Sequence, residues 1–263
     1  MSTNTTFTRA LTSLKRFLLL RQERHQARGT HHEAGDYQYL VIFTYGRTGS
    51  TVLQGALNSI DGICIRGENY GAVNQMEKLH KVVARTHNEQ SGGITTDTIS
   101  PWYGAHMIDV DGTLKSLRQT LVAQILRPPA GTTVVGFKEI RHTPDYFDSL
   151  DGLLEYALFL DKLLPGVKFV VNTRNAEDTS KSGWWKDDPN APKVLETARE
   201  WMLALPEHLR ARLGKDRVVV MDYETWNKNP EELARMIREL GFEPDMARLE
   251  EVSTRRLDHM QQK

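Results

Sequence analysis

The sequence has little cysteine, and this limits the chemistry that it can support. Its 263 residues include one cysteine, Cys64. A single cysteine excludes a disulfide framework within the chain and a cysteine-rich metal site. Cys64 lies in the apolar run 62–65, so we interpret it as a buried strand residue that packs as a small hydrophobe. The sequence has no His/Cys cluster that indicates a metal, and we predict none.

The sequence also lacks an excess of charge of either sign. It carries 34 Lys and Arg against 34 Asp and Glu, a formal net charge of zero. A neutral chain has no global field to attract nucleic acid or an anionic membrane. We therefore expect no nucleic-acid partner, and any anion must be held by a local site.

Long hydrophobic runs are missing as well. The apolar cluster 17–20 near the N-terminus is far shorter than the roughly 20 residues that a membrane-spanning helix needs. No small-residue cleavage site follows it, which makes it a poor signal peptide. The sequence thus predicts no transmembrane segment and a cytoplasmic protein.

The N-terminal part is predicted to stand apart from the rest of the chain. Residues 10–28 have the pattern of a basic amphipathic helix, and a polar linker follows. We interpret 1–36 as a helical extension with its linker and 37–263 as one domain. The helix can pack on the domain or on a second subunit, which would give a homodimer. Attachment to a membrane surface is disfavoured because the helix has few apolar residues to bury.

Short apolar segments alternate with helical patterns in the predicted domain. The five candidate strands are 39–43, 63–65, 132–137, 167–171 and 217–221. Continuous apolar strands separated by helices are typical of a parallel sheet covered on both faces. The predicted fold class is therefore α/β, a P-loop-like three-layer fold with a central parallel sheet of about five strands flanked by helices. In such sheets ligands bind beyond the C-terminal ends of the strands.

The segment after the first strand has the composition of an anion site. Residues 44–51 lie between a buried strand and a helix start, whose unpaired N–H groups and dipole favour an anion. Gly46 and Gly49 allow the backbone to approach that anion closely. Arg47 supplies a permanent positive charge, and the hydroxyl residues after Gly49 supply further donors.

The same loop departs from the P-loop of nucleoside triphosphatases. Thr44 stands where that motif has its first glycine, and Ser50 stands where it has its lysine. A triphosphatase also needs an acidic metal ligand at a strand end, for which Asp222 is the one candidate. A nucleotide kinase or triphosphatase is one alternative function. A nucleotide-binding module without catalysis is another.

The loop does resemble a motif of another family. Residues 47–51, Arg-Thr-Gly-Ser-Thr, are similar to the 5′-phosphosulfate loop of sulfotransferases, in which a basic residue precedes Ser/Thr-Gly-Ser/Thr-Thr. The resemblance implies the sulfate donor 3′-phosphoadenosine 5′-phosphosulfate (PAPS), its product 3′,5′-bisphosphoadenosine (PAP), and no metal. The residues that would cradle the 5′-phosphosulfate are Gly46, Arg47, Thr48, Gly49, Ser50 and Thr51.

Two later segments resemble the same family in the same order. Arg174 follows the fourth strand, and Ser182 comes eight residues later, inside the next predicted helix, as in the family's 3′-phosphate site. Arginine binds phosphate oxygens through paired hydrogen bonds, so the chemistry agrees. Tyr223, after the fifth strand, matches the family residue near the adenine, with Trp184 and Trp185 as competing neighbours.

The resemblance also implies catalytic roles. Arg47 would neutralise charge on the leaving group, and Lys138, in a segment similar to that of glycan-type and bacterial members, would face the sulfuryl group or the acceptor. Glu68, after the second strand, is the base that we expect. Its alternative roles are an acidic loop residue or an ion-pair partner of Arg66. His142 is the rival base, but it lies two residues beyond the family's Lys-x-His position, where Ile140 stands.

The acceptor is not readable from the sequence, and a small molecule, a glycan and a lipid head group all stay open. The side chains expected to face it are Arg141, Trp102, Tyr103 and His106. The loop 91–109 is long enough to be a lid or an acceptor surface. Arg255 and Arg256 are either a further 3′-phosphate contact or a solvated basic tail.

Overall fold

The computed structural model describes residues 37–91 and 98–254, and the predicted N-terminal extension and Arg255 and Arg256 lie outside them. The strands are β1 (Gln38–Phe43), β2 (Ile63–Arg66), β3 (Val134–Glu139), β4 (Lys168–Thr173) and β5 (Val218–Asp222). The α-helices are α2 (Ser50–Asn58), α3 (Ala72–Gln90), α4 (Val110–Thr120), α5 (Leu150–Leu163), α6 (Ala176–Ser180), α7 (Ala191–Leu213), α8 (Tyr223–Trp226), α9 (Pro230–Glu239) and α10 (Met246–Thr254). The shorter 3-10 and π segments are η1 (Ala105–Met107), η2 (Leu121–Leu126), η3 (Gly183–Asp187) and η4 (Lys215–Arg217).

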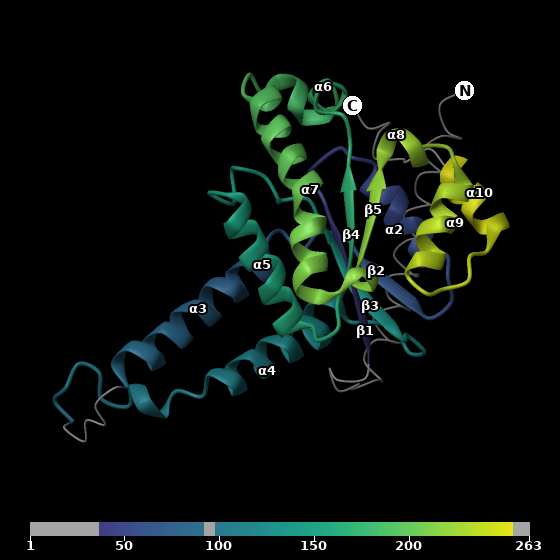
Figure 1. The fold of residues 1–263 in the computed structure, drawn as a ribbon. Helices are drawn as coiled ribbons and strands as arrows, with labels where there is room; N and C mark the ends of the chain where they lie inside the picture. The colour runs from purple at the N-terminus through teal and green to yellow at the C-terminus, as the bar shows by residue number, and fades with distance from the viewer. Residues whose placement is uncertain (1–36, 92–97, 255–263) are drawn as a thin grey trace, which may run out of the picture.

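The five strands within residues 37–91 and 98–254 form one parallel sheet, as predicted. Their order is β2-β3-β1-β4-β5, so the first strand of the chain lies in the middle (Figure 1). Val41 of β1 pairs with Phe137 on one side and with Phe169 on the other. All five C-terminal ends therefore lie at one edge of the sheet, where ligands of such folds bind.

Helices cover both faces of the sheet, which confirms the three-layer fold (Figure 1). Successive strand residues point to opposite faces. In β1, Val41 and Phe43 join a core cluster with residues of α3, α5 and α7, whereas Leu40 and Ile42 join a second cluster with residues of α2, α9 and α10. Cys64 is buried in β2, as expected.

Four strands end later than the hydrophobic pattern predicts: β2 and β5 by one residue, and β3 and β4 by two. The third strand was expected to end at Phe137, but β3 continues through Lys138 and Glu139, both buried. The fourth continues through Thr173. A polar residue ends an apolar run in the sequence, so the hydrophobic pattern predicts that the strand stops there. In the structure these polar residues of β3 and β4 are buried and still belong to the strands.

One helix is shorter than the prediction. Ser182 was expected inside the helix after β4, but α6 ends at Ser180 and Ser182 has extended backbone before η3. Gly183 follows with a φ of 62°, a conformation that ends a regular helix. Ser182 therefore lies on a turn rather than on a helix face.

Helix α3, η1 and α4 project from the body of the molecule as an arm (Figure 1). Trp102 and Tyr103 lie on this arm, and about half of each side chain is exposed.

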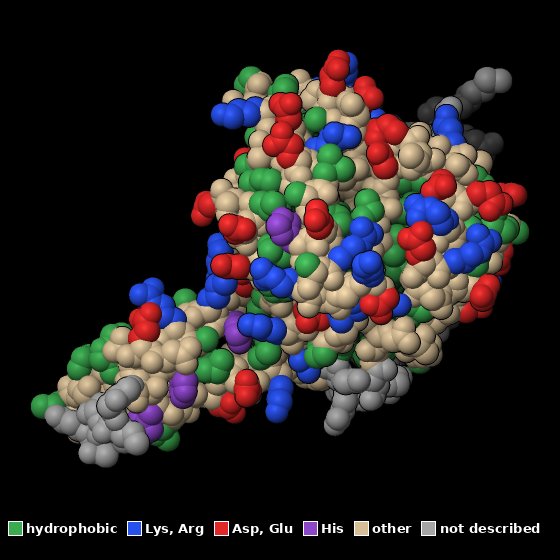
Figure 2. Space-filling view, in the orientation of Figure 1, with side chains coloured by type: hydrophobic (Ala, Val, Ile, Leu, Met, Phe, Trp, Pro, Cys, Tyr) green, Lys and Arg blue, Asp and Glu red, His purple; other side chains and the backbone are tan. Residues whose placement is uncertain are grey.

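Acidic and basic side chains are interspersed on the face of the molecule in Figure 2, in keeping with the neutral chain. None of the helices described is long and apolar enough to cross a bilayer. Within the same residues, no group of His, Cys, Asp and Glu could hold a metal ion.

Candidate active site

A network of buried hydrogen bonds holds the loop between β1 and α2 in its conformation. The hydroxyls of Thr44 and Thr48 lie 2.8 Å apart, and Thr44 also donates to the carbonyl oxygen of Asn172 at 2.8 Å. The Asn172 amide donates to the carbonyl oxygen of Thr48 at 3.0 Å. The predicted cradle residue Thr48 thus turns its hydroxyl into the fold, where it holds the shape of the loop.

Aromatic side chains pack directly against the two loop glycines. Gly49 has a φ of 75°, and a Cβ there would lie 2.6 Å from the rings of Tyr223 and Trp226. A Cβ on Gly46 would lie 2.6 Å from Trp184. Only glycine fits these positions, because any side chain would displace a ring.

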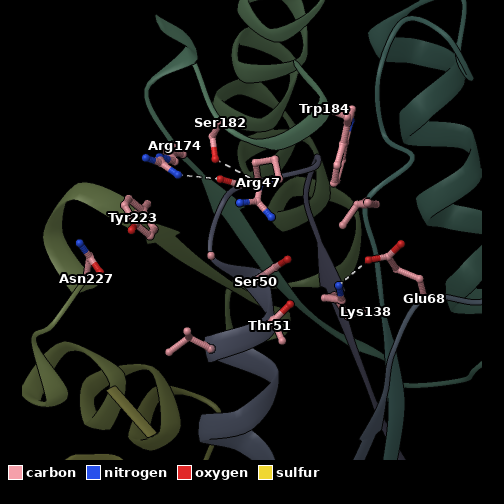
Figure 3. A pocket seen from close by; sticks show the side chains of 13 residues that line it. Arg47, Ser50, Thr51, Glu68, Lys138, Arg174, Ser182, Trp184, Tyr223 and Asn227 are labelled. Atoms are coloured by element: carbon pink, nitrogen blue, oxygen red, sulfur yellow. Dashed lines mark hydrogen bonds and ion pairs between the residues drawn. The ribbon is translucent and has the colours of Figure 1, made fainter. Parts of the chain in front are cut away.

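A pocket of about 310 Å³ opens above this loop, at the C-terminal edge of the sheet (Figure 3). Its lining residues are Arg47, Gly49, Ser50, Thr51, Val52, Glu68, Lys138, Ile140, Arg174, Ser182, Trp184, Tyr223 and Asn227. The charged members are three cations and one carboxylate, so the lining carries a positive excess although the whole chain is neutral. An anion is the ligand that such a lining favours.

Arg47 lies at the centre of this pocket (Figure 3). Its Nε donates to the Ser182 hydroxyl at 3.1 Å, and its guanidinium lies 5.7 Å from the centre of the Trp184 ring. Burial lowers the pKa of Arg47, and the positive charge of Arg174 lowers it further. A bound anion would raise the pKa of Arg47 again, because it would interact with the guanidinium in place of the lost solvent and would offset the repulsion between Arg47 and Arg174.

Arg174 is held rigidly against the loop. The Tyr45 hydroxyl accepts from the Arg174 amide at 3.0 Å and donates to the Arg174 carbonyl oxygen. Burial raises the pKa of Tyr45 to about 12, so its hydroxyl keeps its proton. The Arg174 guanidinium donates to the carbonyl oxygen of Arg47 at 2.9 Å and lies 4.3 Å from the centre of the Tyr223 ring. Its Nε is buried and has no hydrogen-bond partner among the residues that the structure describes, so a bound anion could accept from it.

Glu68 and Lys138 form an ion pair at the other side of the pocket. Lys138 Nζ lies 2.6 Å from Glu68 Oε1 (Figure 3). Because β2 and β3 are neighbours in the sheet, the residues at their C-terminal ends meet. Arg141 contributes a weaker contact, with Nη1 3.7 Å from Glu68 Oε2. Among the described residues that line the pocket, Glu68 is the one carboxylate.

His142, the rival base, lies in the core instead of the pocket. Its side chain is fully buried, stacked 3.6 Å from the Phe43 ring, and its Nδ1 lies 2.8 Å from the Thr44 carbonyl oxygen. Burial lowers the pKa of His142 to about 4. Ile140, which stands at the family's histidine position, does line the pocket.

The remaining predicted residues divide into three groups. Ser50, Thr51, Ser182 and Tyr223 line the pocket together with the cations. Arg141 lines an adjoining hollow of about 290 Å³, whose lining shares Ile140 and Trp184 with the first. Trp102, Tyr103 and His106, expected to face the acceptor, line neither hollow because they lie on the arm.

The sequence reading missed several lining residues: Val52 and Asn227 in the pocket, and Thr143, Asp145 and Tyr146 in the adjoining hollow. Asn227 follows α8 and lies four residues after Tyr223, a spacing that could have indicated it. Tyr146 forms part of the adjoining hollow and is 55% exposed, and no pattern in the sequence distinguishes it from a surface tyrosine.

Comparison with known families gives one match over most of the chain. Residues 40–244 match the Sulfotransferase family. The chain belongs to the sulfotransferase family. The matched range contains β1 from Leu40 onward, all of β2 to β5, and every residue that lines the pocket. Comparison with curated proteins gives no match.

Solved structures of sulfotransferases are similar to this sulfotransferase at low sequence identity. One from Alicyclobacillus acidocaldarius is 14% identical, with a TM-score of 0.46, and the alignment covers 86% of this chain and 99% of that one. The sulfotransferase domain of the Synechococcus PCC 7002 olefin synthase is 15% identical, with a TM-score of 0.49 and coverage of 89% and 86%. A sulfotransferase domain from the curacin biosynthetic pathway is 14% identical, with a TM-score of 0.49 and coverage of 84% and 79%. These scores are low, so the family assignment rests on the sequence match.

Proposed function

We propose that this sulfotransferase moves the sulfuryl group from PAPS to a hydroxyl of its acceptor, with an amine as the less favoured nucleophile. The observation that carries the proposal is the cationic pocket above the β1–α2 loop, in a chain of this family. The bound donor supplies an activated sulfuryl group, and PAP is the product released.

The residues around the pocket fit such a donor. The 5′-phosphosulfate of the donor would be held by Arg47, by the hydroxyls of Ser50 and Thr51, and by the N–H groups at the start of α2. Arg174 and Ser182 would hold the 3′-phosphate, and the buried Arg174 Nε, which donates to no residue in the described part of the chain, is a donor for it. Tyr223 would lie near the adenine. The glycines allow this fit, because a Cβ at Gly49 would push against Tyr223.

Glu68 is the proposed base. Its carboxylate would take the proton of the acceptor hydroxyl as the acceptor oxygen forms its bond to sulfur and the bond from sulfur to the 5′-phosphate oxygen of the donor breaks, which releases PAP. Lys138, at 2.6 Å, orients this carboxylate and adds positive charge beside the reacting group. His142 is not proposed as the base, because its ring is fully buried in the core.

Arg47 is the proposed stabiliser of the leaving group. Its guanidinium is already oriented by Ser182 and by the Trp184 ring, so little reorganisation is needed when negative charge develops nearby. The positive end of α2 adds to the same effect.

The acceptor would enter through the adjoining hollow. This hollow joins the main pocket at Ile140 and Trp184, and Tyr146 and Arg141 form its outer part. Aromatic walls with one cation, Arg141, and one carboxylate, Asp145, suit a small molecule or a glycan that offers an apolar face to the rings and hydroxyls to the charged groups.

The direct test is transfer from radiolabelled PAPS to a panel of defined acceptors: 2-naphthol, tyramine, N-acetylglucosamine and chitotriose. We expect a labelled product from at least one, and its rate should fall by about 10²–10⁴-fold in Glu68→Gln while PAP affinity is retained. Wild-type rate in Glu68→Gln, with loss of rate in a folded His142→Gln variant, would overturn the assignment of the base.

A further inference from the structure

One buried carboxylate beside the pocket has no role in the proposed reaction. Glu139 is the last residue of β3 and is fully buried. Because successive strand residues point to opposite faces, it points away from the face on which Lys138 meets Glu68. A buried carboxylate is costly unless donors surround it, so its partners are informative.

Three donors surround the Glu139 carboxylate. Oε2 accepts from the Gly71 amide at 3.1 Å, and Oε1 accepts from the Ile140 amide at 2.9 Å and from Arg141 Nη1 at 2.7 Å. Gly71 is the N-cap of α3, so the carboxylate also lies at the positive end of a 19-residue helix. Burial alone would raise the pKa of Glu139, but the two amide bonds and the neighbouring cation hold it below its usual value. The side chain is therefore a fixed anion at neutral pH.

The Gly71 contact ties Glu139 to the segment that carries Glu68. This segment, residues 67–71, joins β2 to α3. It ends in two residues with positive φ, Tyr70 at 59° and Gly71 at 75°. A left-handed tyrosine is an uncommon conformation that its surroundings must enforce. The Glu139 carboxylate holds the amide of Gly71, and the Arg141 guanidinium lies 4.3 Å from the centre of the Tyr70 ring.

Glu139 also keeps the Arg141 guanidinium away from the Glu68 carboxylate. Arg141 Nη1 lies 2.7 Å from Glu139 but 3.7 Å from Glu68. Glu68 is thereby left with Lys138, at 2.6 Å, as its close partner. Without the negative charge at position 139, Arg141 is released toward Glu68, and a carboxylate between two close cations is a weaker base.

We propose that Glu139 is a positioning residue for sulfuryl transfer, which acts through Glu68 by anchoring the 67–71 segment and by retaining Arg141. This inference rests on the proposed function, in which Glu68 is the base.

The test is a double-mutant cycle between Glu139→Gln and Glu68→Gln. Glutamine keeps the shape of Glu139 and removes its charge. The assay is transfer from PAPS to the panel acceptor with the highest rate, or to water if no panel member reacts. We expect kcat to fall about 10–100-fold in Glu139→Gln with KM for PAPS unchanged. In the Glu68→Gln background the same change should have no further effect. An unchanged kcat, or equal losses in both backgrounds, would overturn the proposal.

A matched control and a second readout keep the test decisive. Glu77→Gln removes another buried carboxylate, which pairs with Lys81 within α3, and should leave kcat unchanged.

Hydrogen–deuterium exchange of residues 67–72 should be faster in Glu139→Gln than in the wild type and unchanged in Glu77→Gln. If Glu139→Gln does not fold, Glu139→Asp, which keeps the charge but shortens the reach to the Gly71 amide, enters the same cycle, where an unchanged kcat or equal losses in both backgrounds again contradict the proposal. Absence of both PAP binding and transfer in the wild type would contradict the proposed function itself, whereas normal wild-type transfer with an unaffected Glu139→Gln contradicts only this inference.

Discussion

At the scale of single residues, the pocket depends on two arginines that the fold brings together. Arg174 donates to the backbone of Arg47, and the two positive charges oppose each other until an anion is bound. Arg174→Ala should weaken PAP binding by about 1.5–3 kcal/mol, because hydrogen bonds to a charged group are lost. This corresponds to a Kd raised roughly 10–150-fold in isothermal titration.

A suitable control for that variant is Arg235→Ala. Arg235 is also a paired arginine, bound to Glu232 and Glu239, but it lies on α9. Its loss should leave the PAP affinity unchanged. An equal loss of affinity in both variants would mean that general charge, rather than the Arg174 site, governs binding.

His142 gives a prediction for stability against pH. The unfolded residue takes up a proton near pH 6.5, whereas burial holds the folded pKa near 4. Between these values only the unfolded state is protonated, so stability falls as the pH is lowered through this window. The loss attributable to His142 is about 2 kcal/mol at pH 5. Urea unfolding at pH 7 and pH 5 should show a smaller loss in His142→Gln than in the wild type, and an equal loss would contradict this account.

At the scale of elements, the β1–α2 turn determines the shape of the pocket floor. Gly49→Ala places a Cβ against Tyr223 and Trp226 at a φ of 75°. We expect a destabilisation of roughly 2–4 kcal/mol, from left-handed strain and overpacking, together with weaker PAP binding. Gly152→Ala, in the first turn of α5, meets no atom closer than 3.7 Å and should be neutral or stabilising in the same thermal melts. Equal melting temperatures for the two variants would show that the turn tolerates a side chain.

The elements themselves were largely predictable from the sequence. Buried parallel strands are apolar on both faces, so the five runs stand out, and the helices follow from their periodicity and caps. The strand ends were less predictable. Lys138 and Glu139 look like loop residues by composition, yet their buried pairing with Glu68 and Arg141 keeps them in β3.

The sequence predicted which residues lie at the C-terminal ends of the strands, but it did not predict which of their side chains contact one another. Arg47, Arg174 and Tyr223 were placed together by the rule for parallel sheets, and they do line one pocket. The Glu68–Lys138 pair depends on β2 lying beside β3, a neighbour relation that local pattern does not encode. His142 could not be excluded from the sequence, because nothing in Arg141-His142-Thr143 indicates full burial.

At the scale of the whole molecule, a neutral chain concentrates positive charge in one pocket. A ligand that binds only the folded state stabilises it by mass action. PAP at about 100 times its Kd should therefore add about 2.7 kcal/mol of stability, and EDTA should not reduce the effect. Differential scanning calorimetry with and without EDTA measures this. A PAP-induced shift in melting temperature that EDTA abolishes would mean that a metal is required.

The most direct measurement of the central claim is isothermal titration of the wild-type chain with PAP in EDTA and, separately, with ATP in excess Mg²⁺. The cationic pocket without a P-loop lysine predicts metal-independent binding of PAP, at least about tenfold tighter than that of ATP with Mg²⁺. Tighter binding of ATP with Mg²⁺, or no binding of PAP, would contradict the assignment of this pocket to the sulfate donor.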